Sequence, residues 1–100
     1  MTRILEFRPD ARKDFDDAAD RYESQRQGLR VDFVHAVNVT LANILNAPLF
    51  FPIVHGSNVR RALVRRFPYA MLFAVEENRI LIYAVFHTSR NPIIWRGRVE

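Results

Sequence analysis

The sequence predicts an α/β fold of the α+β kind: a strand, an antiparallel hairpin of two helices, and then a three-stranded antiparallel meander. Apolar residues recur every three or four positions between residues 10 and 45, which is the period of an amphipathic helix. Short apolar runs separated by turn residues follow between residues 59 and 87, as expected for strands. A length of 100 residues suits one domain, and we expect residues 1–100 to form a single domain.

The N-terminal half contains the first strand and both helices. The strand is expected at Arg3–Arg8, where apolar residues lie between charged ones. Pro9 ends that run and is favourable in the first turn of a helix. One amphipathic helix is predicted over Asp10–Gln27 and a second over Leu29–Leu45, with Gly28 as the break between them. Because the link is so short, the two helices should pack as an antiparallel hairpin.

The C-terminal half contains the meander. The segment Ala47–Asn58 holds two prolines and a glycine and is expected to be a loop with little regular structure. Strands are predicted at Val59–Phe67, Tyr69–Glu76 and Arg79–His87, with Glu77-Asn78 as a tight turn. Two helices on one face of this sheet would bury the apolar stripes of both helices.

Composition excludes several classes of protein. The chain is 49% hydrophobic and 26% charged, which is typical of a globular domain rather than a disordered tail. It has no cysteine, so disulfide scaffolds and thiol nucleophiles are excluded. No apolar run approaches the length of a membrane span or a secretory leader. We therefore expect a cytoplasmic protein without a membrane partner.

The positive charge is unevenly distributed along the chain. Residues 1–58 carry 7 Arg or Lys and 8 Asp or Glu, a net charge of −1, whereas residues 59–100 carry 8 Arg and 3 Glu, a net charge of +5. Arginine presents a planar fork of donors that suits phosphates and carboxylates. The surplus predicts an anionic partner, which could be a nucleic acid or an acidic protein segment.

The candidate functional residues are the basic and aromatic residues of the C-terminal half. His87 could act as an acid or base, since an imidazole exchanges protons near neutral pH, but a structural hydrogen-bonding role is equally consistent with its place at a strand end. The three histidines, at positions 35, 55 and 87, do not have the spacing of metal ligands. We expect no metal and no cofactor.

Two stretches of the C-terminal half resemble a known group of proteins. The first is Val59-Arg60-Arg61 followed by Arg66-Phe67-Pro68-Tyr69, and the second is Val85-Phe86-His87-Thr88-Ser89-Arg90-Asn91-Pro92 with Trp95 after it. Together with the order of elements, they resemble the RelE/ParE superfamily of toxins from type II toxin–antitoxin systems. The second stretch is similar to the plasmid stabilisation branch of that group. The resemblance implies a growth-inhibiting toxin that forms a hetero-oligomer with a cognate antitoxin.

The superfamily contains two different activities. RelE-like members cut messenger RNA on the ribosome, whereas ParE-like members poison DNA gyrase. For a nuclease, the resemblance implies that His87, Arg66 and Arg90 are catalytic, with His87 as acid or base. The residues implied in binding the antitoxin or the target are Arg60, Arg61, Arg65, Tyr69 and Trp95.

The sequence departs from the nuclease pattern at two positions. RelE-like enzymes carry arginines where this sequence has Ala70 and Thr88. Loss of fixed cations from a phosphoryl-transfer site would remove much of the stabilisation of the transition state. The resemblance therefore favours a gyrase poison that is not an enzyme. Two alternatives stay open: a ribosome-dependent mRNA endonuclease that uses His87, and a non-toxic remnant that only binds antitoxin.

Overall fold

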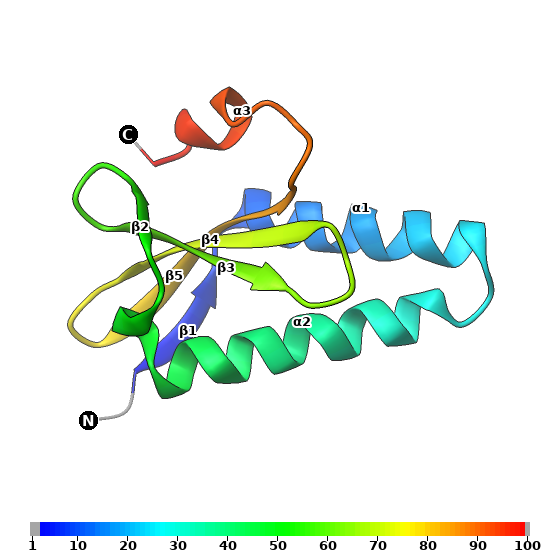
Figure 1. Ribbon diagram of the computed structural model, residues 1–100, viewed down its shortest axis with the longest axis horizontal. Helices are drawn as coiled ribbons and strands as arrows, with labels where there is room; N and C mark the ends of the chain where they lie inside the picture. The colour runs from blue at the N-terminus through cyan, green and yellow to red at the C-terminus, as the bar shows by residue number, and fades with distance from the viewer. Residues whose placement is uncertain (1–2, 100) are drawn as a thin grey trace.

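Two long helices pack on one face of a five-stranded sheet in the computed structural model, which describes residues 3–99 (Figure 1). A short C-terminal helix lies on the other face of the sheet. The elements follow the order β1 (Ile4–Phe7), α1 (Pro9–Gln25), α2 (Leu29–Asn46), the 3₁₀ helix η1 (Pro48–Phe50), β2 (Ile53–His55), β3 (Val59–Val64), β4 (Tyr69–Val75), β5 (Arg79–His87) and α3 (Ile93–Arg96). The predicted fold class is confirmed.

The helix hairpin forms where the sequence predicts it. Helix α1 begins with Pro9 and buries three alanines, which lets it lie close to the sheet. Gly28 separates the helices with a φ of 94°, a left-handed conformation that glycine adopts without strain. The carboxylate of Glu23 accepts hydrogen bonds from the backbone N–H groups of Gly28 and Arg30, and this caps the first turn of α2. None of the helices within residues 3–99 is long and apolar enough to cross a bilayer.

The sheet has the strand order β1-β5-β4-β3-β2, with β1 parallel to β5 and every other pair antiparallel. Side chains alternate between the two faces of the central strands. Tyr69, Met71 and Phe73 of β4 pack beneath the helices, whereas Ala70 and Leu72 face the other side with Trp95 of α3. Since both faces are covered, β4 and β5 read as nearly continuous apolar runs.

The segment between α2 and β3 contains more structure than the expected loop. It includes η1 and the short edge strand β2, which adds a strand to the predicted meander. Phe51 packs its ring against Phe73, with centroids 5.7 Å apart. Arg60 donates hydrogen bonds to the carbonyl oxygens of Leu49 and Phe51. These long-range contacts, which local composition does not encode, order the segment.

Strand β3 ends at Val64 rather than Phe67. Residues 65–68 form a turn instead, and Arg66 within it has a φ of 72°. Pro68 lacks an N–H group, and Phe67 turns inward to pack on the rings of Tyr22 and Phe33. Arg65 and Arg66 are therefore exposed residues of a turn rather than alternating residues of a strand.

Candidate functional site

The predicted functional residues divide between the two faces of the sheet. Tyr69 and His87 are register partners on β4 and β5. Both lie on the helix side of the sheet, in a cavity that residues of α1 also line. Arg61 of β3 and Trp95 of α3 lie on the opposite face. Arg90, in the loop after β5, borders the cavities on both faces. The predicted residues that line a cavity therefore belong to two cavities, one on each face, with Arg90 common to both.

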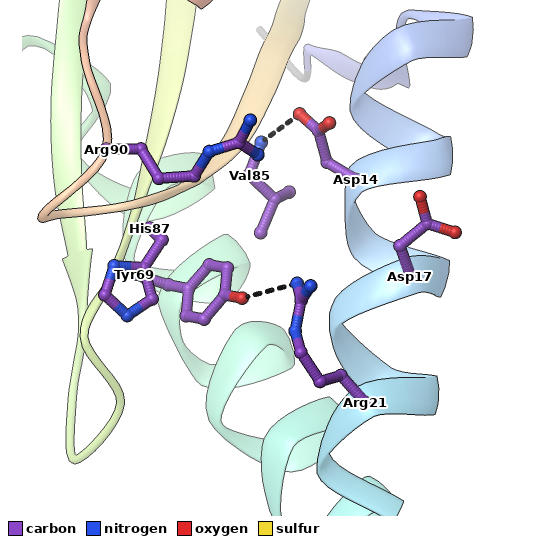
Figure 2. A pocket seen from close by; sticks show the side chains of 7 residues that line it. All are labelled: Asp14, Asp17, Arg21, Tyr69, Val85, His87 and Arg90. Atoms are coloured by element: carbon purple, nitrogen blue, oxygen red, sulfur yellow. Dashed lines mark hydrogen bonds between the residues drawn. The ribbon is translucent and has the colours of Figure 1, made fainter. Parts of the chain in front are cut away.

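A cavity of about 490 Å³ lies on the helix side of the sheet, and we call it the helix-side pocket (Figure 2). It opens between α1 and the end of the sheet. Its walls carry charged groups of both signs and two polar rings. The lining residues are Asp14, Asp17, Arg21, Tyr69, Val85, His87 and Arg90.

His87 is held by its neighbours within this pocket. Its ring makes an edge contact with Tyr69, with centroids 5.2 Å apart, and Arg21 donates a hydrogen bond of 3.1 Å to the Tyr69 hydroxyl. The Nδ1 atom of His87 accepts a hydrogen bond from the backbone N–H of Ser89 at 3.1 Å. Because an N–H group can only donate, neutral His87 carries its proton on Nε2. These contacts fit a positioned, hydrogen-bonded histidine.

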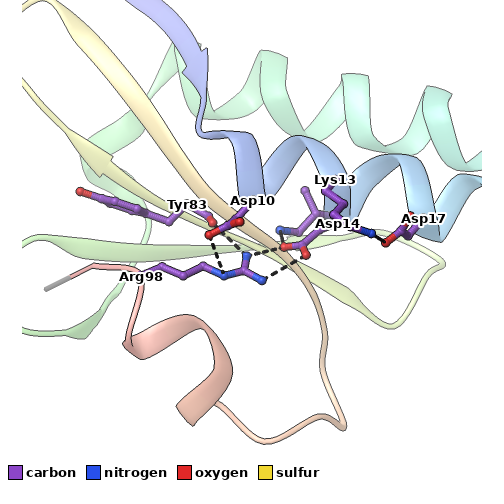
Figure 3. Close-up of polar contacts among 7 residues, drawn as sticks. Asp10, Lys13, Asp14, Asp17, Tyr83 and Arg98 are labelled. Carbon is purple, nitrogen blue, oxygen red and sulfur yellow. Dashed lines mark hydrogen bonds and ion pairs between the residues drawn. The ribbon is translucent and has the colours of Figure 1, made fainter.

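The two aspartates of the helix-side pocket are already neutralised (Figure 3). Asp14 pairs with Arg98 at 2.6 Å and accepts a hydrogen bond from the backbone N–H of Val85. Asp17 pairs with Lys13 at 2.7 Å. The hydrogen bond that Arg98 donates to Asp14 raises the pKa of Arg98 above its ordinary value. Both carboxylates therefore serve as ion-pair partners and are poorly suited to act as free bases.

The cavity on the other side is the open-face groove, with a volume of about 230 Å³. Buried apolar side chains from the central strands form its floor, and arginines from three elements surround them. The lining residues are Val54, Arg61, Ala70, Leu72, Phe86, Thr88, Arg90, Pro92, Trp95 and Arg96. An apolar floor with positive charges around it matches an anionic ligand that also has an apolar part.

Both positions at which the sequence departs from the RelE-like pattern line the open-face groove. Ala70 projects from β4 and Thr88 follows β5, and neither carries a charge. His87 does not line this groove, because it lies on the helix side with Tyr69. The imidazole and the two substituted positions thus line different cavities.

The remaining predicted residues have distinct surroundings. Trp95 is only 5% exposed; its ring contacts that of His55, and the Arg96 guanidinium lies 5.7 Å from its centroid. Arg60 is bonded to the carbonyls that precede β2. Trp95 therefore forms a packed wall, and Arg60 supports η1.

Sequence reasoning missed the contribution of α1 to the helix-side pocket. Asp16, Asp17 and Asp20 of α1 are exposed, whereas the side chain of Asp14 is only 20% exposed. Asp14 lies three residues after Ala11 and four before Ala18, so it borders the buried stripe. Arg21 follows Ala18 by three residues in the same way. This spacing relative to the buried alanines could have indicated that Asp14 and Arg21 lie at the edge of the sheet-facing side of α1.

Within residues 3–99, no cluster of three or more His, Asp or Glu side chains could hold a metal ion.

Comparison with known proteins places the chain in a family. The family described as "ParE toxin of type II toxin-antitoxin system, parDE" matches residues 5–92. No curated protein matches the chain. A solved structure of a chromosomal ParDE TA system from P. aeruginosa is similar with a TM-score of 0.76, at 16% identity over 88% of this chain and 98% of that chain. The YoeB dimer from Staphylococcus aureus is similar with a TM-score of 0.60, at 16% identity over 86% of this chain and 97% of that chain.

At this identity the two structures establish the fold alone. The family match covers most of the sequence, from β1 to the loop before α3. The chain belongs to the ParE toxin family of type II toxin–antitoxin systems.

Proposed function

We propose that this chain is a single-domain toxin of the plasmid stabilisation kind that arrests growth by poisoning DNA gyrase. The family supports a toxin with a cognate antitoxin as its partner. The observation that carries the choice of target is the open-face groove, where Ala70 and Thr88 occupy the positions of the arginines of RelE-like nucleases. A toxin without those cations lacks charge that RelE-like nucleases carry at these positions, which supports a mode of inhibition other than cleavage of RNA.

The physical argument concerns the geometry of phosphoryl transfer. Cleavage at an RNA phosphate needs a proton acceptor, a proton donor and positive charge, all within hydrogen-bond reach of one phosphate. His87 lies on the helix side of the sheet, whereas Arg61 and Arg96 border the opposite groove. This separation disfavours a RelE-like arrangement that combines His87 with Arg61 or Arg96. Arg90 borders both cavities, and we propose binding roles for Arg66 and Arg90 because the positions of the RelE-like arginines are taken by Ala70 and Thr88.

We propose that the antitoxin occupies the open-face groove. Leu72 and Phe86 offer an apolar floor, and Arg61, Arg90 and Arg96 surround it. An antitoxin segment with acidic residues on either side of an apolar side chain would complement this surface. Segments of this kind commonly fold as they bind.

The experiment is to induce the protein alone in bacteria and pulse-label new DNA and new protein in the first minutes. Early failure of DNA synthesis, together with loss of supercoiling by purified gyrase, supports the proposal. Early failure of protein synthesis would instead support the nuclease alternative. If neither process fails while antitoxin still binds, the chain is a non-toxic remnant.

His87→Gln and Arg61→Glu provide matched variants for this experiment. The proposal expects His87→Gln to keep its toxicity, because the imidazole has no catalytic task. A nuclease that uses His87 would lose toxicity in this variant while keeping its fold and its antitoxin. Arg61→Glu should weaken antitoxin binding, since it reverses a charge beside the open-face groove.

A further inference from the structure

One end of the sheet gathers four arginines from three parts of the chain. The backbone N–H of Thr88 donates a 2.8 Å hydrogen bond to the carbonyl of Pro68, which fastens the loop after β5 to the turn between β3 and β4. This places Arg65 and Arg66 of the turn at the same end as Arg90. Arg21 reaches the same end from α1 through its hydrogen bond to Tyr69 (Figure 2). We call these four residues the arginine end.

The four arginines are not neutralised within the part of the chain that the structure describes. No ion pair joins Arg21, Arg65, Arg66 or Arg90 to a carboxylate there. The nearby Asp14 and Asp17 are each occupied by another cation. All four arginines are exposed, so their full charge is presented to a partner.

The other groups at this end suit phosphates. Thr88, Ser89 and Asn91 are exposed beside Arg90, and hydroxyl and amide groups of this kind accompany arginine in contacts with a nucleic-acid backbone. The neighbouring rings are engaged within the protein: Tyr69 is 4% exposed, half-buried Phe67 packs on Tyr22 and Phe33, and half-buried His87 contacts Tyr69. An arginine-rich end whose rings already have partners favours backbone contact over the stacking that single strands use.

The conformation of Arg66 is a second, independent observation. Its φ of 72° lies in the left-handed region, and Arg66 is the one residue other than glycine with a positive φ in residues 3–99. Glycine would adopt this conformation without strain. Strained residues cluster at functional sites. An arginine here lowers stability relative to glycine, and its side chain is exposed.

We infer that the arginine end binds the phosphate backbone of double-stranded DNA, without reading its sequence. This goes beyond the proposed function, because the contact is made by the toxin itself and needs neither gyrase nor antitoxin. Since gyrase acts on duplex DNA, such a contact would hold the toxin beside its proposed target.

The test is a fluorescence anisotropy titration of a short duplex with the purified chain over a series of salt concentrations. Four phosphate contacts predict that a fourfold rise in salt weakens binding on the order of 100-fold. Each of Arg65→Ala, Arg66→Ala and Arg90→Ala should lower the slope of log affinity against log salt by about 0.9. Arg12→Ala is the matched control, since it removes the same charge from a residue paired with Asp16; its slope should not change.

A further variant separates binding from folding. Arg66→Gly should unfold no more readily than the original chain and yet bind the duplex more weakly, so a damaged fold cannot explain the loss. The inference is overturned if the three arginine variants match Arg12→Ala. It is also overturned if polyglutamate competes as well as DNA, which would assign the arginine end to an acidic protein. Stronger binding to a single strand than to the duplex would contradict it too. Because the titration contains no gyrase, its failure leaves the gyrase proposal untouched.

Discussion

The two ends of the sheet differ in whether their arginines form ion pairs. At the end that carries the β4–β5 turn, Arg79 pairs with both Glu6 and Glu76. At the other end, Arg65, Arg66 and Arg90 have no acidic partner among residues 3–99. A paired arginine contributes to stability, whereas an unpaired one mainly determines what the surface attracts. The comparison teaches that net charge alone does not locate a binding surface.

The largest expected effect on stability concerns a paired arginine, Arg98. Arg98→Ala should lower the free energy of unfolding by about 2–3 kcal/mol, because it leaves Asp14 partly buried without its cation. The guanidinium is only 19% exposed, so solvent screens this pair weakly. Urea denaturation monitored by circular dichroism measures the loss. A change equal to that of Arg12→Ala, whose pair with Asp16 is exposed, would contradict this account.

The next effect is a gain in stability, and it concerns Arg66 at the end of the sheet whose arginines are unpaired. Arg66→Gly should raise the free energy of unfolding by about 1 kcal/mol, since it relieves the left-handed conformation of a residue with a Cβ atom. The same denaturation measurement applies. Arg65→Gly is the control, because Arg65 has no such conformation; there the substitution should bring no gain. Destabilisation by Arg66→Gly would show that the arginine side chain supports the turn.

A smaller effect compares the two ends directly. Arg79→Ala should lower the free energy of unfolding slightly, and less in high salt, because it breaks a partly exposed network with two carboxylates. Arg65→Ala removes the same charge from the other end and should cost about 0.2 kcal/mol or less. Thermal unfolding of both variants in low and high salt provides the measurement. Equal losses for the two variants would remove the distinction between the ends.

The smallest effect depends on pH and concerns the helix hairpin. Backbone N–H groups of Arg30 and Gly28 lower the pKa of Glu23, so this carboxylate stabilises the folded state above the ordinary glutamate pKa. That contribution is lost as pH falls through the lowered value. The original chain should therefore be more stable than Glu23→Gln near neutral pH, with the difference vanishing once the pH falls below the lowered pKa of Glu23. Glu77→Gln, at an exposed turn position, should show no comparable trend in thermal unfolding.

The sequence predicted most of the fold because its signals are local and repetitive. Apolar spacing located α1 and α2, and the long apolar runs located β4 and β5. The edge strand β2 was not predicted, because it depends on contacts of Arg60 and Phe51 with residues elsewhere in the sequence. The early end of β3 was not predicted for a similar reason, since the packing of Phe67 against two helices turns the chain.

The sequence named residues of both cavities but did not show how they are grouped. Tyr69 and His87 line the helix-side pocket, Arg61 and Trp95 line the open-face groove, and Arg90 lines both. The assignment of the strand residues to a face depends on strand register, which pairs Tyr69 with His87. Local sequence does not encode this pairing between strands.

The ion pair between Arg98 and Asp14 has a consequence for association. Strand β1 covers β5 only over Arg79–Ile82, which leaves the rest of that strand's outer edge without a neighbouring strand. Asp14 accepts the N–H of Val85 on this edge, and Arg98 donates to the carbonyl of Tyr83. Exposed strand edges invite addition of strands from other molecules. By occupying these backbone groups, two charged side chains protect a basic, apolar-rich chain from polymerising through its own sheet.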